Sequence, residues 1–228
     1  MLKKCIVLFS GGQDSTTCLY WAKKHFDEVF ALNIYYKQRH WNEIKSAGDI
    51  AKLANVKLLT HNTDLFEQID NSNLLSINKS NSINNKHYNN NSLPSSFVPG
   101  RNIIFMTICA MYAYKLEIKD IVIGVNVVDF SGYPDCRPDT IKTMQQTIEN
   151  GISKINIHTP LIDLNKIQIV KLAQKLNGCM KALSYSHTCY NNKIPPCGIC
   201  PACVIRAKGF KEANIEDPLL KRLNTIVR

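Results

Sequence analysis

Short apolar runs that alternate with helical segments constrain the fold of this chain more than any other feature. Ile6-Val7-Leu8-Phe9 is continuous and apolar, and it ends at Ser10-Gly11-Gly12, as expected of a buried strand that leaves through a tight turn. Similar runs predict further strands at 29–36, 56–59, 120–125 and 155–158. Apolar spacing predicts helices after residue 13 and at 44–54, 103–116, 138–150 and 165–176. This alternation is typical of an α/β fold in which helices cover both faces of a twisted, parallel sheet.

Two segments depart from this pattern. Residues 71 to 91 include nine asparagines and four serines, so we expect a mobile loop over 71–95. After Gly178 the strand pattern stops, and a tail rich in cysteine and proline follows. We therefore expect an α/β domain over residues 1–178 and a small C-terminal module, residues 179–228, packed on it.

Composition excludes several classes of protein. Of the 228 residues, 45% are hydrophobic and 20% are charged, which is too apolar for a disordered chain. The longest uncharged apolar-rich stretch, Asn102 to Tyr114, is shorter than the ~20 residues of a membrane span. The apolar run after Lys3 and Lys4 is also too short for a signal peptide. We expect a cytoplasmic protein without membrane contact, whose net charge of +10 suits an anionic partner but is spread along the chain.

The segment Ser10-Gly11-Gly12-Gln13-Asp14-Ser15 has the composition of a phosphate-binding loop. Glycines let a backbone approach an anion closely, and the N–H groups of a first helical turn point toward it. Ser10, Ser15 and Thr16 add hydroxyl donors, and Asp14 is suited to hold Mg²⁺ beside the phosphates of a ligand. The Walker A sequence is absent. The alternative is an ordinary turn in which Asp14 or Ser15 caps the following helix.

Four of the nine cysteines form a cluster with the spacing C-x7-C-x2-C-x2-C: Cys189, Cys197, Cys200 and Cys203. Clustered thiols in a reducing compartment indicate a metal site rather than disulfides. Tetrahedral Zn²⁺ is the usual ion for four thiolates, and such a closed site leaves no position for a reactive water, so we expect one structural zinc per chain. An iron–sulfur cluster is the alternative, because the last three cysteines also match part of a ferredoxin-type run.

The string Ser-Gly-Gly-Gln-Asp-Ser resembles the SGGxDS loop of the PP-loop ATP pyrophosphatases. The resemblance implies an adenine nucleotide alpha hydrolase-like, Rossmann-like fold and cleavage of ATP between its α and β phosphates. It also implies that ATP binds at the end of the first strand, the loop and the start of the helix. The residues of this expected ATP site are Leu8, Phe9, Ser10, Gly11, Gly12, Gln13, Asp14, Ser15, Thr16, Thr17 and Cys18.

Four further segments resemble the 7-cyano-7-deazaguanine synthase family, a branch of the PP-loop enzymes that acts in queuosine biosynthesis. They are Val98-Pro99-Gly100-Arg101-Asn102, the stretch from Gly124 to Pro138, Thr159-Pro160-Leu161 with Lys166, and the cysteine cluster with Tyr190. Two features depart from the family. A tryptophan common before the first metal cysteine is replaced by Ser186-His187-Thr188, and the asparagine-rich segment matches no family segment that we can place.

Residue types within these segments suggest roles. The expected catalytic residues are Ser10, Asp14, Arg101 and Lys166, and the expected substrate residues are Asp129, Ser131, Asp135 and Arg137. Arg101 is suited to pair with phosphate, and Lys166 to neutralise the transferred phosphoryl group. Among the substrate residues, a carboxylate (Asp129 or Asp135) is suited to accept hydrogen bonds from the N–H groups of a guanine-like base. Arg137 is suited to face a substrate carboxylate. The alternatives are a structural salt bridge for Arg101, a solvated helix lysine at 166, and carboxylates that stabilise a turn.

For this family the resemblance implies an ATP-dependent C–N ligase. It converts 7-carboxy-7-deazaguanine and ammonia into 7-cyano-7-deazaguanine through adenylated intermediates and releases AMP and pyrophosphate. Residue 2 is leucine, so processing exposes no N-terminal cysteine nucleophile of the kind that releases ammonia from glutamine. We therefore expect free ammonium to supply the nitrogen. The resemblance also suggests a homodimer that does not bind nucleic acid directly. Two alternatives stay open: a PP-loop tRNA thiolase with an iron–sulfur or zinc site, and a non-catalytic, zinc-dependent nucleic-acid binder.

Overall fold

The computed structural model describes residues 2–37, 42–66, 86–87, 90–94, 96–126 and 133–226. Its centre is a five-stranded sheet in the order β3-β2-β1-β6-β7, in which every neighbouring pair is parallel. The strands are β1 (Lys4–Leu8), β2 (Glu28–Tyr35), β3 (Lys57–Asn62), β6 (Asp120–Val122) and β7 (Asn156–His158). The helices between and beside them are α1 (Gln13–His25), α2 (Asn42–Ala54), α4 (Arg101–Lys115), α5 (Pro138–Gly151) and α6 (Lys166–Lys175). The predicted parallel α/β sheet is confirmed.

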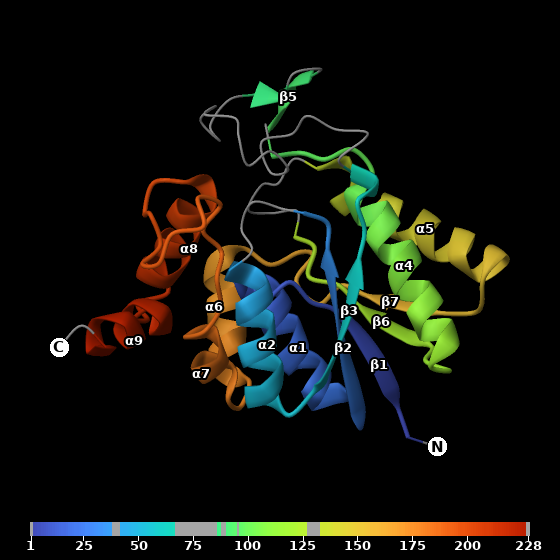
Figure 1. Ribbon diagram of the computed structural model, residues 1–228, viewed down its shortest axis with the longest axis horizontal. Coiled ribbons are helices and arrows are strands. Elements are labelled where there is room, and N and C mark those ends of the chain that lie inside the picture. The colour runs from blue at the N-terminus through green and yellow to red at the C-terminus, as the bar shows by residue number, and fades with distance from the viewer. Residues whose placement is uncertain are drawn as a thin grey trace.

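Alternate residues of each central strand pack on opposite faces of the sheet. In β1, Cys5 and Val7 belong to the core under α1, α2 and α6, whereas Ile6 belongs to the core under α4 and α5. Ala31 and Leu32 of β2 divide between the two cores in the same way. Figure 1 shows α4 and α5 on one side of the sheet and α1, α2 and α6 on the other. Because both faces are buried, the strands consist of continuous apolar runs.

The order of the strands places a ligand-binding edge beside β1. From β1 the sheet extends through β2 and β3 on one side and through β6 and β7 on the other. In open parallel sheets, ligands bind outside the carboxyl ends of the strands at such a switch point. The loop between β1 and α1 and residues 123–126, which follow β6, both lie at this edge.

Strand β6 is shorter than the predicted run at 120–125. After Val122 the chain leaves the sheet and passes against the first turn of α1. A Cβ on Gly124 would lie only 3.3 Å from the backbone C of Asp14 and the backbone N of Ser15. The close approach brings the residues after β6 next to the predicted phosphate loop.

The C-terminal module consists of α7 (Cys179–Leu183), α8 (Pro201–Glu212) and α9 (Pro218–Ile226) together with the cysteine-rich loop. Leu183 and Phe210 join the same core as α1 and α6. A Cβ on Gly209 would lie 2.8 Å from the Cβ of Lys166, so α8 packs closely on the start of α6. The module therefore packs on the sheet, and its division from the rest of the chain at residue 178 remains a prediction.

In the asparagine-rich region, β4 (Lys86–His87) pairs with β5 (Asn90–Pro94) in an antiparallel ladder. The remainder of the predicted loop at 71–95 lies outside the described residues, so its mobility stays a prediction. Across the described residues, every helix is too short or too polar to cross a lipid bilayer.

Candidate active site

The loop between β1 and α1 leaves the start of the helix without a side-chain cap. Helix α1 begins at Gln13, and its N-cap is Gly12, which has extended backbone angles. No side chain of the described residues caps it, so the predicted capping role of Asp14 or Ser15 is wrong. Ser15 Oγ instead accepts hydrogen bonds from the backbone N–H groups of Ser10 (3.3 Å) and Gly11 (3.2 Å). Without a cap, the N–H groups of the first turn are suited to bind an anion.

The two adjacent glycines have different structural roles. Gly11 has a φ of +90°, and a Cβ there would lie 2.6 Å from both the backbone N of Ala47 and the backbone O of Glu43 in α2. A side chain at Gly11 would therefore meet a helix rather than a ligand. Gly12 has ordinary extended angles and lines a cavity, so its missing side chain leaves room for a ligand.

The cavity beside this loop has a volume of about 360 Å³. Seven of the predicted ATP-site residues line it: Leu8, Phe9, Ser10, Gly12, Gln13, Asp14 and Ser15. Side chains from other parts of the chain complete the wall, among them Tyr36, Arg101, Tyr133, Lys166, Thr188, Tyr190 and Arg206. The cavity thus combines the phosphate loop with residues from α4, α6 and the C-terminal module.

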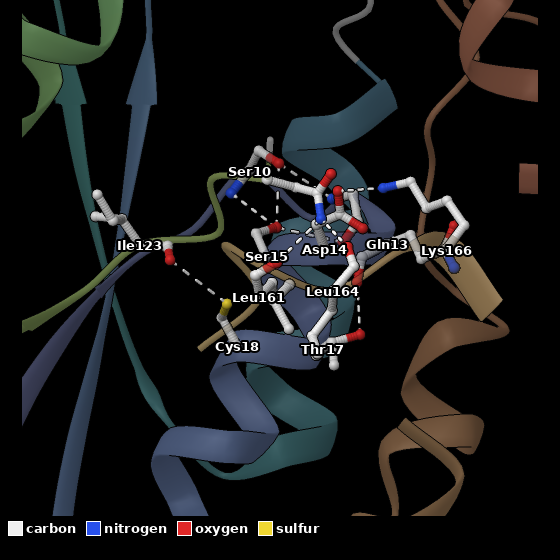
Figure 2. Close-up of polar contacts among 12 residues, drawn as sticks. Ser10, Gln13, Asp14, Ser15, Thr17, Cys18, Ile123, Leu161, Leu164 and Lys166 are labelled. Carbon is white, nitrogen blue, oxygen red and sulfur yellow. Dashed lines mark hydrogen bonds and ion pairs between the residues drawn. The ribbon is translucent and has the colours of Figure 1, made fainter. Parts of the chain in front are cut away.

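Asp14 and Lys166 form an ion pair at the start of α1. Lys166 Nζ lies 2.5 Å from Asp14 Oδ2, and Figure 2 shows the two side chains meeting there. The other carboxylate oxygen, Asp14 Oδ1, is buried without a hydrogen-bond partner among the described residues, as are Gln13 Nε2 and Thr16 Oγ1. Buried polar atoms without partners are uncommon, since each costs about 1–3 kcal/mol. At the cavity wall, Gln13 Nε2 fits a phosphate oxygen and Asp14 Oδ1 fits a divalent cation such as Mg²⁺.

Local structure fixes Lys166 in this position. It is the first residue of α6, whose N-cap Asn165 forms a capping box with Gln168. The Lys166 side chain is only 16% exposed, and α8 packs against its Cβ through Gly209. Lys166 is therefore not a solvated helix lysine, and its charge is directed toward the phosphate loop.

Arg101 lies among three tyrosines at the cavity wall. It is the first residue of α4, and its guanidinium carbon is 5.6 Å from the centre of the Tyr133 ring. Burial raises the pKa of Tyr36, Tyr133 and Tyr190, so their hydroxyls stay neutral at neutral pH. Arginine stays protonated when it is buried. A permanent cation among neutral hydroxyls is suited to bind a phosphate or a carboxylate.

The structure describes two of the four predicted substrate residues, Asp135 and Arg137. Asp129 and Ser131 fall outside the described residues. Asp135 is 4% exposed, and its carboxylate accepts hydrogen bonds from the backbone N–H (2.9 Å) and the side-chain amide (3.1 Å) of Asn102. It thereby holds the first turn of α4. Arg137 is exposed and does not line the cavity. The substrate roles of these residues remain predictions.

The other predicted ATP-site residues do not line the cavity: Gly11, Thr16, Thr17 and Cys18. Thr17 Oγ1 donates to the carbonyl of Gln13 at 3.0 Å, and Cys18 Sγ donates to the carbonyl of Ile123 at 3.7 Å (Figure 2). Burial raises the pKa of the Cys18 thiol well above its usual value, so it stays protonated. Thr17 therefore bonds within the first turn of α1, whereas Cys18 connects α1 to the segment after β6.

The four clustered cysteines come together in space, with all four Sγ atoms within 4.8 Å of one another. Tetrahedral zinc with Zn–S bonds of ~2.3 Å places its sulfur atoms ~3.8 Å apart. The Sγ atoms of Cys197 and Cys203 are 3.9 Å apart. Backbone N–H groups also point at the sulfurs: Cys197 N lies 3.5 Å from Cys189 Sγ, and Cys200 N lies 3.4 Å from Cys197 Sγ. Such donors stabilise thiolates, so the cluster could hold a metal ion.

Comparison with known proteins places the chain in a family. Residues 4–214 match the family model described as "Queuosine biosynthesis protein QueC". The chain belongs to the QueC family. It is 44% identical over 225 residues to the 7-cyano-7-deazaguanine synthase of Chromobacterium violaceum, which covers 96% of this chain and 94% of that protein. The enzyme of the same name from Bacillus subtilis is 42% identical over 212 residues, covering 92% and 94%.

The resemblance inferred from the four segments of the sequence is thereby confirmed. Among solved structures, the chain is similar to the NMN synthetase of Francisella tularensis. The two share 16% sequence identity with a TM-score of 0.47, and the match covers 98% of this chain and 82% of the other.

Several side chains that line the cavity of this QueC-family protein were not predicted from the sequence as site residues: Tyr36, Tyr133, Thr188, Tyr190 and Arg206. Tyr36 follows the carboxyl end of β2, where ligands of parallel sheets bind, so its position was a usable signal. Thr188 and Tyr190 flank the first cysteine of the cluster, which was interpreted only as a metal ligand. Nothing in the sequence indicated that Arg206 would border the same cavity.

Proposed function

We propose that this protein is an ATP-dependent ligase that converts 7-carboxy-7-deazaguanine and ammonia into 7-cyano-7-deazaguanine, the product in the names of its relatives. One observation carries the proposal: a single cavity is lined both by the phosphate loop, through Gly12 and Asp14, and by the partly buried cation Arg101. Transfer of the adenylyl group of ATP to an acid requires the phosphates of ATP and the carboxylate of the acid to be held side by side, with the attacking oxygen in line with the bond that breaks.

The chemistry explains why ATP is needed. A carboxylate is a poor electrophile because its leaving group would be an oxide. In the first round the substrate carboxylate attacks the α-phosphate of ATP, pyrophosphate leaves, and ammonia then displaces AMP to give the amide. In the second round the amide oxygen attacks the α-phosphate of a new ATP and pyrophosphate leaves, and loss of AMP and of both amide N–H protons then gives the nitrile. Each oxygen lost from the substrate departs with AMP, so the atoms balance.

Residues at the phosphate loop support the departure of pyrophosphate. The uncapped first turn of α1 carries the positive end of the helix dipole. Gln13 Nε2 supplies an unused donor, and Lys166 supplies a positive charge close to the loop. Asp14 Oδ1 fits Mg²⁺, which when bound would add positive charge against the phosphates. Donors and charges that are already in place stabilise the charge that develops as the bond breaks.

Arg101 is the better candidate for holding the acid group of the substrate. It lines the cavity, whereas Arg137, which sequence reasoning favoured for this role, is exposed and does not. The aromatic rings around Arg101 suit a planar deazapurine, because flat rings stack on one another. Asp129 and Ser131 remain candidates for reading the base, and both carboxylate oxygens of Asp135 are engaged by Asn102.

The proposal includes one structural zinc per chain, held by the four-cysteine cluster. The donor set and the sulfur spacing support zinc, because four thiolates at this separation leave no open position for substrate. When bound, the ion would stabilise the fold of the cysteine-rich loop. Metal analysis tests this point: a brown protein with iron and acid-labile sulfide would replace zinc by an iron–sulfur cluster.

The proposal also places the enzyme in the cytoplasm as a homodimer, which the family resemblance suggests. Three apolar side chains at helical spacing remain exposed along α4: Ile103, Met111 and Tyr114. A second copy would cover them. Light scattering after size-exclusion chromatography gives the mass, and a monomer at micromolar concentration would contradict the dimer.

The test of function is incubation with ATP, ammonium and 7-carboxy-7-deazaguanine, followed by mass spectrometry. The expected products are the nitrile, AMP and pyrophosphate, and Ser10→Ala and Asp14→Ala should strongly reduce their formation. Release of ADP and orthophosphate would refute the proposal. Activity on tRNA with none on the deazapurine acid would favour a tRNA thiolase instead.

A further inference from the structure

The segment Ser186-His187-Thr188 forms part of the wall of the phosphate site. The backbone N–H of His187 donates to the carbonyl of Gly11 at 3.1 Å. A Cβ on Gly12 would lie 3.6 Å from both His187 O and Thr188 Cγ2. Thr188 also lines the cavity beside the loop. The C-terminal module therefore touches both glycines of the phosphate loop.

Among the described residues, the hydroxyl of Thr188 has no hydrogen-bond partner. In the part of the chain that the structure describes, its Oγ1 is buried and unpaired, as is Nε2 of Gln13, a residue that is 3% exposed and lines the same cavity. An unpaired buried hydroxyl is unfavourable unless a ligand completes its bonding. Rotation about χ1 moves a threonine hydroxyl among three staggered positions, one of which is the position that the methyl occupies here. Because the methyl faces Gly12, this rotation also brings the hydroxyl to the loop.

Contacts behind the segment hold it in place. Arg206 of α8 donates to Ser186 Oγ at 2.8 Å and to the carbonyl of Leu183 at 3.2 Å. The same guanidinium pairs with both oxygens of Asp217, at 2.7 and 2.9 Å. Arg206 is only 4% exposed, so water does not compete for these bonds. The position of Thr188 is therefore determined by packing and hydrogen bonds within the C-terminal module.

We propose that Thr188 is a ligand of the outer phosphates of ATP and donates its hydroxyl to the pyrophosphate group held by the loop. This inference rests on the proposed function, because it requires ATP at that loop. Phosphate oxygens accept several hydrogen bonds, so one ligand satisfies both Thr188 and Gln13. Pyrophosphate gains negative charge as it departs, and a donor positioned there favours its departure.

Calorimetric titration with two nucleotides tests the proposal. The first is α,β-methylene ATP, which cannot be cleaved between its α and β phosphates, and the second is AMP, which lacks the outer phosphates. Thr188→Val should bind the ATP analogue about tenfold more weakly than the unaltered protein and should bind AMP equally well. Thr188→Ser keeps the hydroxyl and should bind the analogue within about twofold of the unaltered protein. Thr225→Val, the same change on exposed α9, is the control and should alter neither affinity.

Each other outcome overturns the inference. Equal affinity of Thr188→Val and the unaltered protein for the analogue would show that the hydroxyl does not reach the phosphates. Equal losses for the analogue and AMP would show a general distortion of the cavity, and a loss in Thr188→Ser as large as in Thr188→Val would assign the effect to the methyl. If the unaltered protein itself fails to bind the analogue, both the proposed function and this inference are refuted.

Discussion

Replacing Gly11 by alanine tests whether contact with α2 shapes the phosphate loop. Gly11 has a φ of +90°, where a residue with a Cβ is strained by about 1–2 kcal/mol. The new Cβ would lie 2.6 Å from the backbone N of Ala47 and the backbone O of Glu43, well inside van der Waals contact. Both atoms belong to a helix backbone, so they cannot rotate away as the tip of a side chain could. The loop or α2 must move.

The expected loss of stability follows from these two effects. Overpacking of this kind costs about 1–3 kcal/mol, and the backbone strain adds to it, so unfolding should become easier by about 2–5 kcal/mol. That is a large share of the ~5–15 kcal/mol that stabilises a typical domain. Gly48 is a matched control, since it lies on α2 with no atom within 4 Å of its missing Cβ. Gly48→Ala should leave stability unchanged or raise it by up to ~1 kcal/mol.

Urea denaturation followed by circular dichroism measures the free energy of unfolding of each variant. The midpoint of Gly11→Ala should fall clearly below that of the unaltered protein, whereas the midpoint of Gly48→Ala should not fall. Equal midpoints for Gly11→Ala and the unaltered protein would refute the reasoning, because the loop and α2 would then separate at no cost. An equal loss in both variants would refute it as well, since contact with α2 would not be the cause.

Three further predictions concern other parts of the site. Gly12→Ala should lower the unfolding free energy less than Gly11→Ala, since the φ of Gly12, −78°, is ordinary and the atom nearest the new Cβ is a side-chain oxygen, Ser10 Oγ at 3.3 Å; it should weaken ATP binding in calorimetry about tenfold. Asp217→Ala leaves Arg206 buried and unpaired and should cost about 3–5 kcal/mol in urea denaturation, whereas Glu216→Ala, in a pair whose carboxylate is 64% exposed, should cost under ~1 kcal/mol. Cys200→Ser should bind less metal by mass spectrometry and melt at a lower temperature, and unchanged melting would contradict a structural metal.

The strands and helices were largely predictable from sequence because each strand contributes to two cores. Their continuous apolar runs have no other common explanation in a chain of this composition. The run at 120–125 was predicted as strand throughout, yet pairing ends at Val122. Ile123 and Val125 still pack in the core under α4 and α5, and both also line the cavity. Hydrophobicity alone does not distinguish a buried strand from the wall of a binding site.

The placement of the phosphate loop was also predictable, whereas the use of its side chains was not. A strand, two glycines and a helix are consecutive in sequence, so their geometry is local. The position of the Asp14 carboxylate depends on its ion pair with Lys166, which lies 152 positions further along the chain. Asp14 and Ser15 are common helix caps by residue type, but Asp14 pairs with the distant Lys166, and Ser15 accepts from the backbone of its own loop instead. Likewise Asp135 resembles a substrate ligand in sequence and in the structure holds the first turn of α4 through Asn102.

The four-cysteine site and the ATP cavity share a segment of chain, and this connects metal binding to nucleotide binding. Cys189 follows Thr188 directly, and Cys200 is the N-cap of α8, the helix that carries Arg206. Arg206 in turn bonds Ser186, at the other end of the segment. A structural zinc typically contributes on the order of 10 kcal/mol to the fold of its loop. Loss of the metal would loosen both ends of the segment at once, so Thr188 would no longer be fixed beside the phosphate loop. None of the four cysteines lines the cavity, yet a metal bound to them is expected to affect the affinity for ATP.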